Sequence, residues 1–263
     1  YTPIADPAGF VAWHKDFCKP RGMTGRILIA HERINGTLEG TNEAIAEYMT
    51  ALRATPFADL KDLWIKESPG TGVAFPKFQC RVRTEIVTLG LKESDINPNE
   101  ITGTHLDASE LKKWFENGEE FEIIDMRNDY EYVVGHFKNS IDPKLENFRD
   151  LPKRIDELKH LKNKKVLTVC TYGVRCEKAS GYLKSQGFEN VYQLNGGIGT
   201  YMRQYPGEDF LGSLYVFDNR ITEKFTDAYE VVGRCIRCNT PSELYRNCQD
   251  LSCHRHAIIC DTC

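Results

Sequence analysis

Several features that would assign a function directly are absent from this sequence. It contains no run of ~18 apolar residues able to cross a bilayer and no visible signal peptide, so we expect a cytoplasmic protein without membrane contact. It contains no flavin-, haem- or His–His–carboxylate iron-binding motif. Its net charge of −4 lacks the basic excess typical of nucleic-acid-binding proteins, so any RNA-binding surface must be local.

Cysteine, in contrast, is abundant, with ten residues in a chain of 263. Without a secretion signal, we interpret these cysteines as catalytic thiols and metal ligands rather than disulfides. Two Cys-x-x-Cys pairs near the end of the chain, about 22 residues apart, have the spacing of a tetrahedral zinc site. The predicted metal ligands are Cys235, Cys238, Cys248, Cys253, Cys260 and Cys263. Cys248, Cys253, His254 and His256 leave room for a second ion, and a reduced, poorly ordered tail is the alternative.

The most informative stretch begins with the strand-like run 166–169 and ends in Cys170. A short loop and a helix-like segment follow, so the thiol faces a helix N-terminus. The N–H groups of that helix end, with the charge of Arg175, favour the thiolate. We therefore predict that Cys170 is a nucleophile. An anion on it would contact Arg175 and the backbone of Thr171, Tyr172, Gly173 and Val174. The alternative is that Cys170 is a buried small hydrophobe.

The chain divides into three segments by pattern. Residues 1–92 predict a small α+β sandwich, with helices at 7–18 and 42–52, strands at 25–31, 62–66 and 81–89, and a turn at Asn35-Gly36. Residues 93–103, rich in Asp, Asn and Pro, predict a linker.

Residues 104–204 alternate strand and helix, which predicts a parallel α/β sheet covered on both faces. The expected strands are 121–126, 166–170 and 191–194, and the helices 107–117, 152–161 and 177–186. Ligands bind beyond the carboxyl ends of such strands, where Asp125 and Cys170 both lie. Residues 205–263 lose regular pattern after a short strand at 214–217.

Three motifs resemble those of the rhodanese domain. Cys170-Thr-Tyr-Gly-Val-Arg-Cys176 resembles its active-site loop, residues 123–137 its upstream Asp-x-Arg signature, and residues 187–198 the motif that closes the domain. Together with the doubled cysteine and the leading segment 29–36, the whole chain resembles the bacterial tRNA uridine-34 hydroxylases. These rhodanese-domain proteins make 5-hydroxyuridine at the wobble position.

The resemblance implies a fold for each segment. It implies a ferredoxin-like or acylphosphatase-like N-terminal domain in 1–92, a rhodanese-like α/β domain in 104–204, and a Cys-rich, zinc-binding-like tail in 205–263. It also implies that the substrate is the anticodon wobble uridine of tRNA and that molecular oxygen is the co-substrate.

Other functions stay open at this point. One alternative is a sulfurtransferase that carries a persulfide on Cys170, and a weaker one is a zinc-tailed binding module. Arg175 follows Cys170 by five positions, one fewer than in cysteine phosphatases, which argues against phosphatase activity. The sequence does not indicate the oligomeric state or the electron source.

Several neighbours have two interpretations. Cys176 either resolves an oxidised Cys170 or packs inward, and Tyr172 either stacks on a base or narrows access. We expect Asp125 and Arg127 to form an ion pair in the wall of the site. Glu131 and His136 are expected to fasten the loop that follows.

A local RNA surface is the remaining candidate site. The predicted residues are Arg26, His31, Lys77, Arg81 and Arg83, with Arg33 as a possible neighbour. An ordinary solvated strand face is equally consistent with them. His31 beside Glu32 predicts either acid–base chemistry or the capping of a turn.

Overall fold

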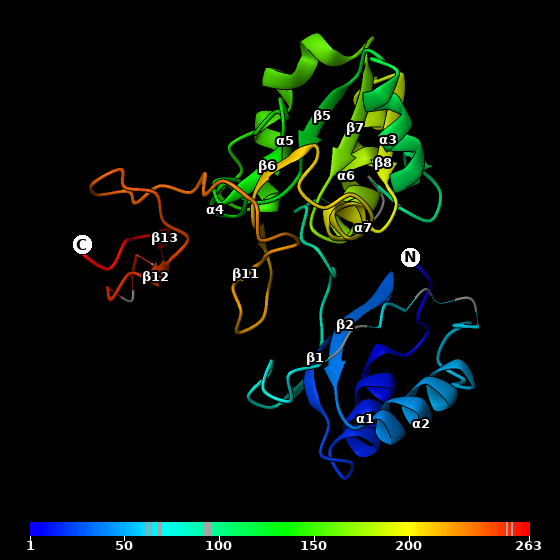
Figure 1. Ribbon diagram of the computed structural model, residues 1–263. Helices are drawn as coiled ribbons and strands as arrows, with labels where there is room; N and C mark the ends of the chain where they lie inside the picture. Colours follow the sequence, from blue (N-terminus) through cyan, green and yellow to red (C-terminus); the bar gives the residue numbers. More distant parts are fainter. Residues whose placement is uncertain (62, 64, 68–69, 92–95, 251, 254) are drawn as a thin grey trace. The chain divides into compact units, whose positions relative to one another are not determined.

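The computed structural model describes the chain apart from residues 62, 64, 68–69, 92–95, 251 and 254 (Figure 1). It divides into two compact units, residues 1–86 with 218–220 and residues 87–217 with 221–263. Among the described residues, no helix combines the length and the apolar character needed to cross a membrane.

Over its described residues, the first unit contains a three-stranded sheet and two helices. Its elements are α1 (Pro7–Cys18), β1 (Thr24–Ala30), β2 (Arg33–Glu39), α2 (Asn42–Arg53) and β3 (Phe78–Val82). The strand order is β2-β1-β3, and β1 runs antiparallel to β2 and parallel to β3. Asp6 caps α1 and Thr41 caps α2 through side-chain oxygens that accept backbone N–H bonds. Buried residues of α1, α2 and β1, such as Phe10, Ile29 and Leu52, form its core.

Two sequence predictions for this unit, a turn and a strand, differ from the structure. Asn35 and Gly36 lie inside β2, and the turn falls at residues 31–32 between the paired Ala30 and Arg33. Gly36 is needed for close packing, because a Cβ there would lie 2.7 Å from the Arg26 carbonyl oxygen. The strand expected at 81–89 ends at Val82.

The strand expected at 62–66 falls partly outside the described residues, since Asp62 and Trp64 are not described. Leu63 and Ile65 pack against the core, and neither belongs to a strand. Their apolar side chains produced the strand pattern without any strand pairing.

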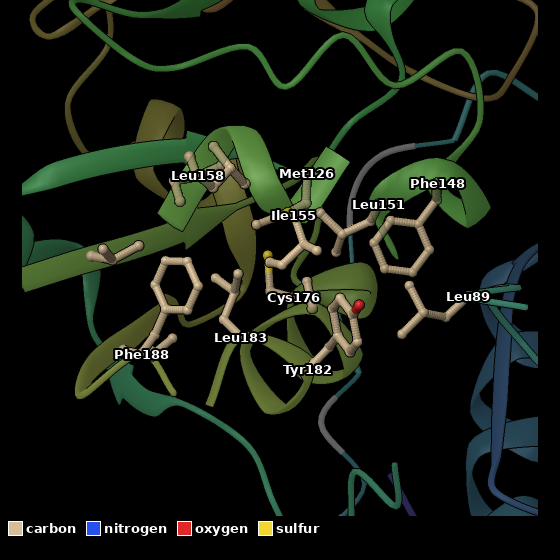
Figure 2. Close-up of a cluster of buried hydrophobic side chains, with 14 of the residues drawn as sticks. Leu89, Met126, Phe148, Leu151, Ile155, Leu158, Cys176, Tyr182, Leu183 and Phe188 are labelled. Carbon is tan, nitrogen blue, oxygen red and sulfur yellow. The ribbon is translucent and has the colours of Figure 1, made fainter. Parts of the chain in front are cut away.

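The second unit contains the predicted parallel sheet. It is built from β4 (Thr104–Leu106), β5 (Glu122–Asp125), β7 (Lys165–Val169) and β8 (Asn190–Leu194), in the order β4-β8-β7-β5. One apolar cluster packs α3 (Ala108–Glu116) and α7 (Gly197–Gln204) on one face of the sheet. Another packs α5 (Leu151–Arg154) and α6 (Val174–Ser185) on the other face (Figure 2). The mixed α/β architecture and the sheet covered on both faces are confirmed.

One helix of this unit differs from expectation. Residues 152–161 were predicted to form a single α-helix. They instead divide into α5 and a 3₁₀ segment, Ile155–Leu161, after a 3₁₀ turn at Phe148–Asp150. The apolar side chains of Ile155, Leu158 and Leu161 are buried at a spacing of three residues, which suits the 3₁₀ repeat.

The remaining elements of this unit are short. The helix α4 (Asp129–Tyr132) precedes β6 (Gly135–Phe137), which pairs with β9 (Phe210–Gly212). The strand expected at 214–217 is β10 (Leu214–Tyr215), paired with β11 (Thr222–Glu223). The tail forms a hairpin of β12 (Tyr245–Asn247) and β13 (His256–Ile258). A small cluster of Val134, Tyr215, Tyr245 and Ile258 packs this hairpin beside α4.

Candidate active site and cysteine cluster

Cys170 lies directly after β7, at the carboxyl edge of the parallel sheet. Neighbouring β5 ends at Asp125, which pairs in register with Val169, so both predicted residues share this edge. The loop enters α6 through Gly173, whose φ of 85° is the left-handed conformation that suits glycine. The backbone N–H groups of Arg175 and Cys176 donate to the Cys170 sulfur. The first turn of α6 therefore surrounds the sulfur with donors.

These donors decide the protonation of the two thiols. Burial alone would raise the pKa of Cys170, which is 1% exposed. Hydrogen bonds from the Cys176 thiol and from two backbone N–H groups, together with the Arg175 charge, lower the pKa to about 6. Burial and the adjacent Cys170 raise the pKa of Cys176 well above its usual value. The pair therefore carries one negative charge, which lies on Cys170. Cys176 keeps its proton and donates a hydrogen bond to that thiolate.

The guanidinium of Arg175 is held by Glu131 of α4. Its Nη1 lies 2.5 Å from Glu131 Oε1 and its Nη2 lies 2.8 Å from Oε2. Nη2 also donates to the Thr171 hydroxyl at 3.2 Å. Burial disfavours the charged guanidinium, but the Glu131 carboxylate raises its pKa above the usual value. Arg175 therefore acts on Cys170 through its charge and its backbone N–H, while its side chain joins the loop to α4.

A second buried ion pair lies beneath α4. Arg127 donates to both carboxylate oxygens of Asp125, at 2.9 and 2.6 Å, and to the carbonyl oxygens of Glu131 and Gly135. Arg127 is completely buried. His136 lies further out, where its Nδ1 is 3.0 Å from the Tyr132 carbonyl oxygen and its ring stacks on Tyr132. Asp125 and Arg127 thus fix the backbone around Glu131, which in turn orients Arg175.

Helix α7 closes the other side of the loop. The N–H groups of Ile198 and Gly199 donate to the carbonyl oxygens of Cys170 and Thr171. At Gly197, with φ of 67°, a Cβ would lie 2.6 Å from the Cys170 carbonyl oxygen. Only glycine allows this approach.

The sequence left the roles of Tyr172 and Cys176 open, and the structure shows the contacts of both side chains. The Tyr172 ring lies against Gly199, and its hydroxyl donates to Glu223 Oε2 at 3.3 Å. Cys176 is 0% exposed and lies in the apolar cluster with Ile155 and Leu183 (Figure 2). Cys176 is therefore packed inward and also donates a hydrogen bond to the Cys170 sulfur. Inward packing thus leaves its thiol next to Cys170, where a resolving thiol would have to lie.

The tail gathers four of the six predicted metal ligands. The sulfur atoms of Cys235, Cys238, Cys260 and Cys263 all lie within 4.8 Å of one another. Tetrahedral zinc with Zn–S bonds of about 2.3 Å requires S···S separations of about 3.8 Å, so this donor set fits a metal ion of that kind.

Cys248 and Cys253, which the sequence also offered for a second ion, lie outside this group of four. They occupy the turn between β12 and β13, whereas the four clustered cysteines flank the open end of that hairpin. Of the residues suggested for a second ion, His254 lies outside the described residues. His256 is 2.6 Å from Asn247 Oδ1 and 3.2 Å from the Tyr215 hydroxyl.

The predicted RNA-binding residues all belong to the first unit, and their side chains are exposed: Arg26, His31, Lys77, Arg81 and Arg83. His31 Nδ1 lies 3.0 Å from the Ile4 carbonyl oxygen, and Glu32 accepts from the Ile86 N–H at 2.8 Å. Lys77 and Arg81 line a hollow with Lys15 of α1 and with Lys19, the C-cap residue of that helix. The sequence analysis missed these two lysines, although their i, i+4 spacing places them on one helical face.

Three family models match consecutive parts of the chain. These are the UPF0176 acylphosphatase-like domain over residues 1–86, the rhodanese-like domain over 107–204, and the rhodanese C-terminal model over 211–263.

Curated relatives match the whole chain. A protein of Cytophaga hutchinsonii named tRNA uridine(34) hydroxylase is 43% identical over 264 residues, which cover 100% of this chain and 83% of that protein. A protein of Bacillus pumilus with the same name is 46% identical, over 98% of this chain and 80% of that protein. The family resemblance of the sequence motifs is thereby confirmed.

Proposed function

Because this chain belongs to the tRNA uridine(34) hydroxylase family, we propose that it is an oxidoreductase that converts the wobble uridine of tRNA to 5-hydroxyuridine. The observation that best supports this function is the pair formed by Cys170 and Cys176. The Cys170 sulfur is a thiolate with a pKa of about 6, and the Cys176 sulfur is a thiol that donates a hydrogen bond to it. The catalytic residues would be Cys170 and Cys176, with Arg175 as the positive group that stabilises the Cys170 thiolate.

The thiolate provides the activation that a pyrimidine ring needs. Uridine C5 is a weak nucleophile, but addition of the Cys170 sulfur to C6 moves the ring electron pair toward C5 and O4. The resulting enolate reacts with O₂ at C5 to give a hydroperoxide on the substrate. The backbone donors of residues 171–176 would hold Cys170 in place for the addition and stabilise it when it leaves.

Cys176 would supply the two electrons that reduce the hydroperoxide. Its sulfur takes the outer oxygen of the hydroperoxide, which leaves a hydroxyl on C5 and a sulfenic acid on Cys176. Loss of the C5 proton expels Cys170 from C6 and restores the aromatic ring. Cys170 then condenses with the sulfenic acid to form a disulfide and water. Uridine, O₂ and two thiols thus give 5-hydroxyuridine, water and one disulfide, and an external thiol reduces the disulfide for the next turnover.

The supporting residues have positioning roles in this proposal. Glu131 and Thr171 fix Arg175, while Asp125 and Arg127 fix the backbone that carries Glu131. His136 would secure α4 from its outer side through the Tyr132 carbonyl group. Loop residues Tyr172, Gly173 and Val174 would shape the entrance to the sulfur.

We also propose that the ion held by the four clustered cysteines is zinc, with a structural role. All four donors are sulfur, which leaves no open position for catalysis. The cluster lies next to the hairpin whose Tyr245 hydroxyl donates to the Tyr130 carbonyl oxygen in α4. A tRNA substrate and reduced thiols both imply a cytoplasmic location.

The proposal is tested by incubating the reduced full-length protein with O₂ and an unmodified tRNA transcript that has uridine at position 34. Mass spectrometry of the nucleosides should show 5-hydroxyuridine with wild type and none with Cys170→Ser or Cys176→Ser. Cys253→Ser, outside the thiol pair and the four-cysteine cluster, is the matched control. Label from isotopic O₂ should appear in the product. Transfer of sulfur from thiosulfate to cyanide, with no change in the tRNA, would instead support the sulfurtransferase alternative.

A further inference from the structure

A hollow of about 240 Å³ in the first unit is lined by positive side chains on two sides. Lys15 of α1 and Lys19, the C-cap residue that follows this helix, form one wall. Arg81 of β3 and Lys77, the residue before this strand, form the other. All four side chains are exposed. No acidic residue is among the described residues of the lining, so the hollow concentrates positive charge in a protein whose net charge is −4.

The four cations share a lack of ion pairs within the described part of the chain. None of them forms an ion pair with a described residue, whereas other surface cations do, such as Arg21 with Glu47 at 2.9 Å. The floor of the hollow is Cys80, a buried residue. Burial raises the pKa of its thiol to about 12, so the floor is neutral. Among the described residues, no ion pair therefore neutralises the charge of the hollow.

Structural roles account for only part of this arrangement. Lys15 and Lys19 lie at the C-terminal end of α1, where the helix dipole favours cations. Lysine and arginine also protect an edge strand such as β3 from pairing with another chain. Neither role requires the two pairs to face one hollow, where Lys15 and Lys19, four residues apart on a helical face, repel each other. An anionic ligand would remove that repulsion.

We propose that this hollow binds phosphate groups of the tRNA backbone, an inference that rests on tRNA being the substrate. Gln79 in the lining adds an amide that can donate to a phosphate or a ribose oxygen. On the adjacent strand, the exposed Arg26 pairs in register with Gln79, which extends the positive surface beyond the hollow. Several cations side by side can contact successive phosphates of a nucleic acid, whereas one small anion would contact only some of them.

The test measures the affinity of the full-length protein for an unmodified tRNA transcript over a range of salt concentrations. Two double variants each remove one wall, Lys15→Gln with Lys19→Gln and Lys77→Gln with Arg81→Gln. Each should weaken binding on the order of tenfold at physiological salt. Each should also reduce the slope of log K against log salt by roughly 1–2. Replacement of Lys15 and Lys19 by arginine should restore both values.

Arg53→Gln with Lys61→Gln is the matched control, since it removes two exposed cations of the same unit outside the hollow. Wild-type affinity and slope in both wall variants, or losses equal to that control, would overturn the inference even if thermal stability changed. If wild type hydroxylates tRNA while the wall variants bind normally, only this inference fails. If the wall variants lose affinity as expected but wild type never modifies the tRNA, the proposed function fails and the phosphate site stands.

Discussion

Glu131 and Arg175 face each other through two parallel contacts of 2.5 and 2.8 Å, although 44 residues separate them in the chain. Glu131 also accepts the Asn128 N–H at the start of α4, so one carboxylate fixes both the helix and the cysteine loop. Asp125 and Arg127 form a second such pair beside it. The wall of the site is therefore built from buried charges that satisfy one another.

Glu131→Gln should lower the free energy of unfolding by about 3 kcal/mol, because it leaves the buried Arg175 charge without its partner. Urea unfolding at constant pH measures the change. Glu157→Gln is the control, since it breaks an exposed ion pair with Arg154 at 2.7 Å and should have a much smaller effect. Equal losses in the two variants would show that Glu131 and Arg175 are not coupled.

The thiolate absorbance of Cys170 should titrate with a midpoint near pH 6. The transition should be missing in Cys170→Ser. It should move to higher pH in Cys176→Ala, because the thiol hydrogen bond is lost. A midpoint near 9.0, the ordinary value, would refute the assignment of Cys170 as the resident thiolate.

The same shift predicts a pH-dependent contribution to stability. The folded pKa of about 6 lies below the ordinary value of 9.0, so the folded state loses its proton first. The stabilisation is therefore fully present above about pH 9 and is lost as the pH falls through about 6. The difference in unfolding free energy between wild type and Cys170→Ser should grow from pH 6 to pH 9. Urea unfolding across this range measures it, and a constant difference would contradict the prediction.

Gly197→Ala and Gly118→Ala separate crowding from backbone strain. Both glycines have positive φ, 67° and 63°, but a Cβ at Gly118 meets nothing within 4 Å. We expect Gly118→Ala to cost about 1–2 kcal/mol for the left-handed conformation alone. Gly197→Ala should cost roughly 1–3 kcal/mol more, because its Cβ overlaps the cysteine loop. It should also raise the Cys170 pKa by displacing the backbone donors, and equal costs with an unchanged titration would exclude this role for Gly197.

Local signals in the sequence predicted much of this molecule. Helix α1 has the predicted bounds, because Asp6, Pro7 and the apolar spacing act within one segment. The cysteine loop was recognisable for the same reason, since the nucleophile and its backbone donors are consecutive. Asn35-Gly36 failed as a turn signal because close packing of β1 and β2, a tertiary requirement, fixes Gly36.

Contacts between distant segments were not predictable. Nothing in the spacing of Glu131 and Arg175 indicates that they meet, and the charge pattern did not join Lys15 to Arg81. Similarly, the number of cysteines in the tail showed how many ligands were available. The hairpin decides which of them converge.

That hairpin leads to the last prediction, which concerns the metal. The purified protein should contain one zinc ion per chain, because four sulfur atoms converge at one point. Cys238→Ser or Cys260→Ser should abolish stoichiometric zinc, whereas Cys248→Ser, at the hairpin turn, should retain it. Elemental analysis measures the content, and thermal unfolding should show a lower midpoint after removal of the metal by a chelator. Full zinc content in Cys260→Ser, or its loss in Cys248→Ser, would move the site to the other cysteines and would make the hairpin turn, rather than its open end, the metal-binding element.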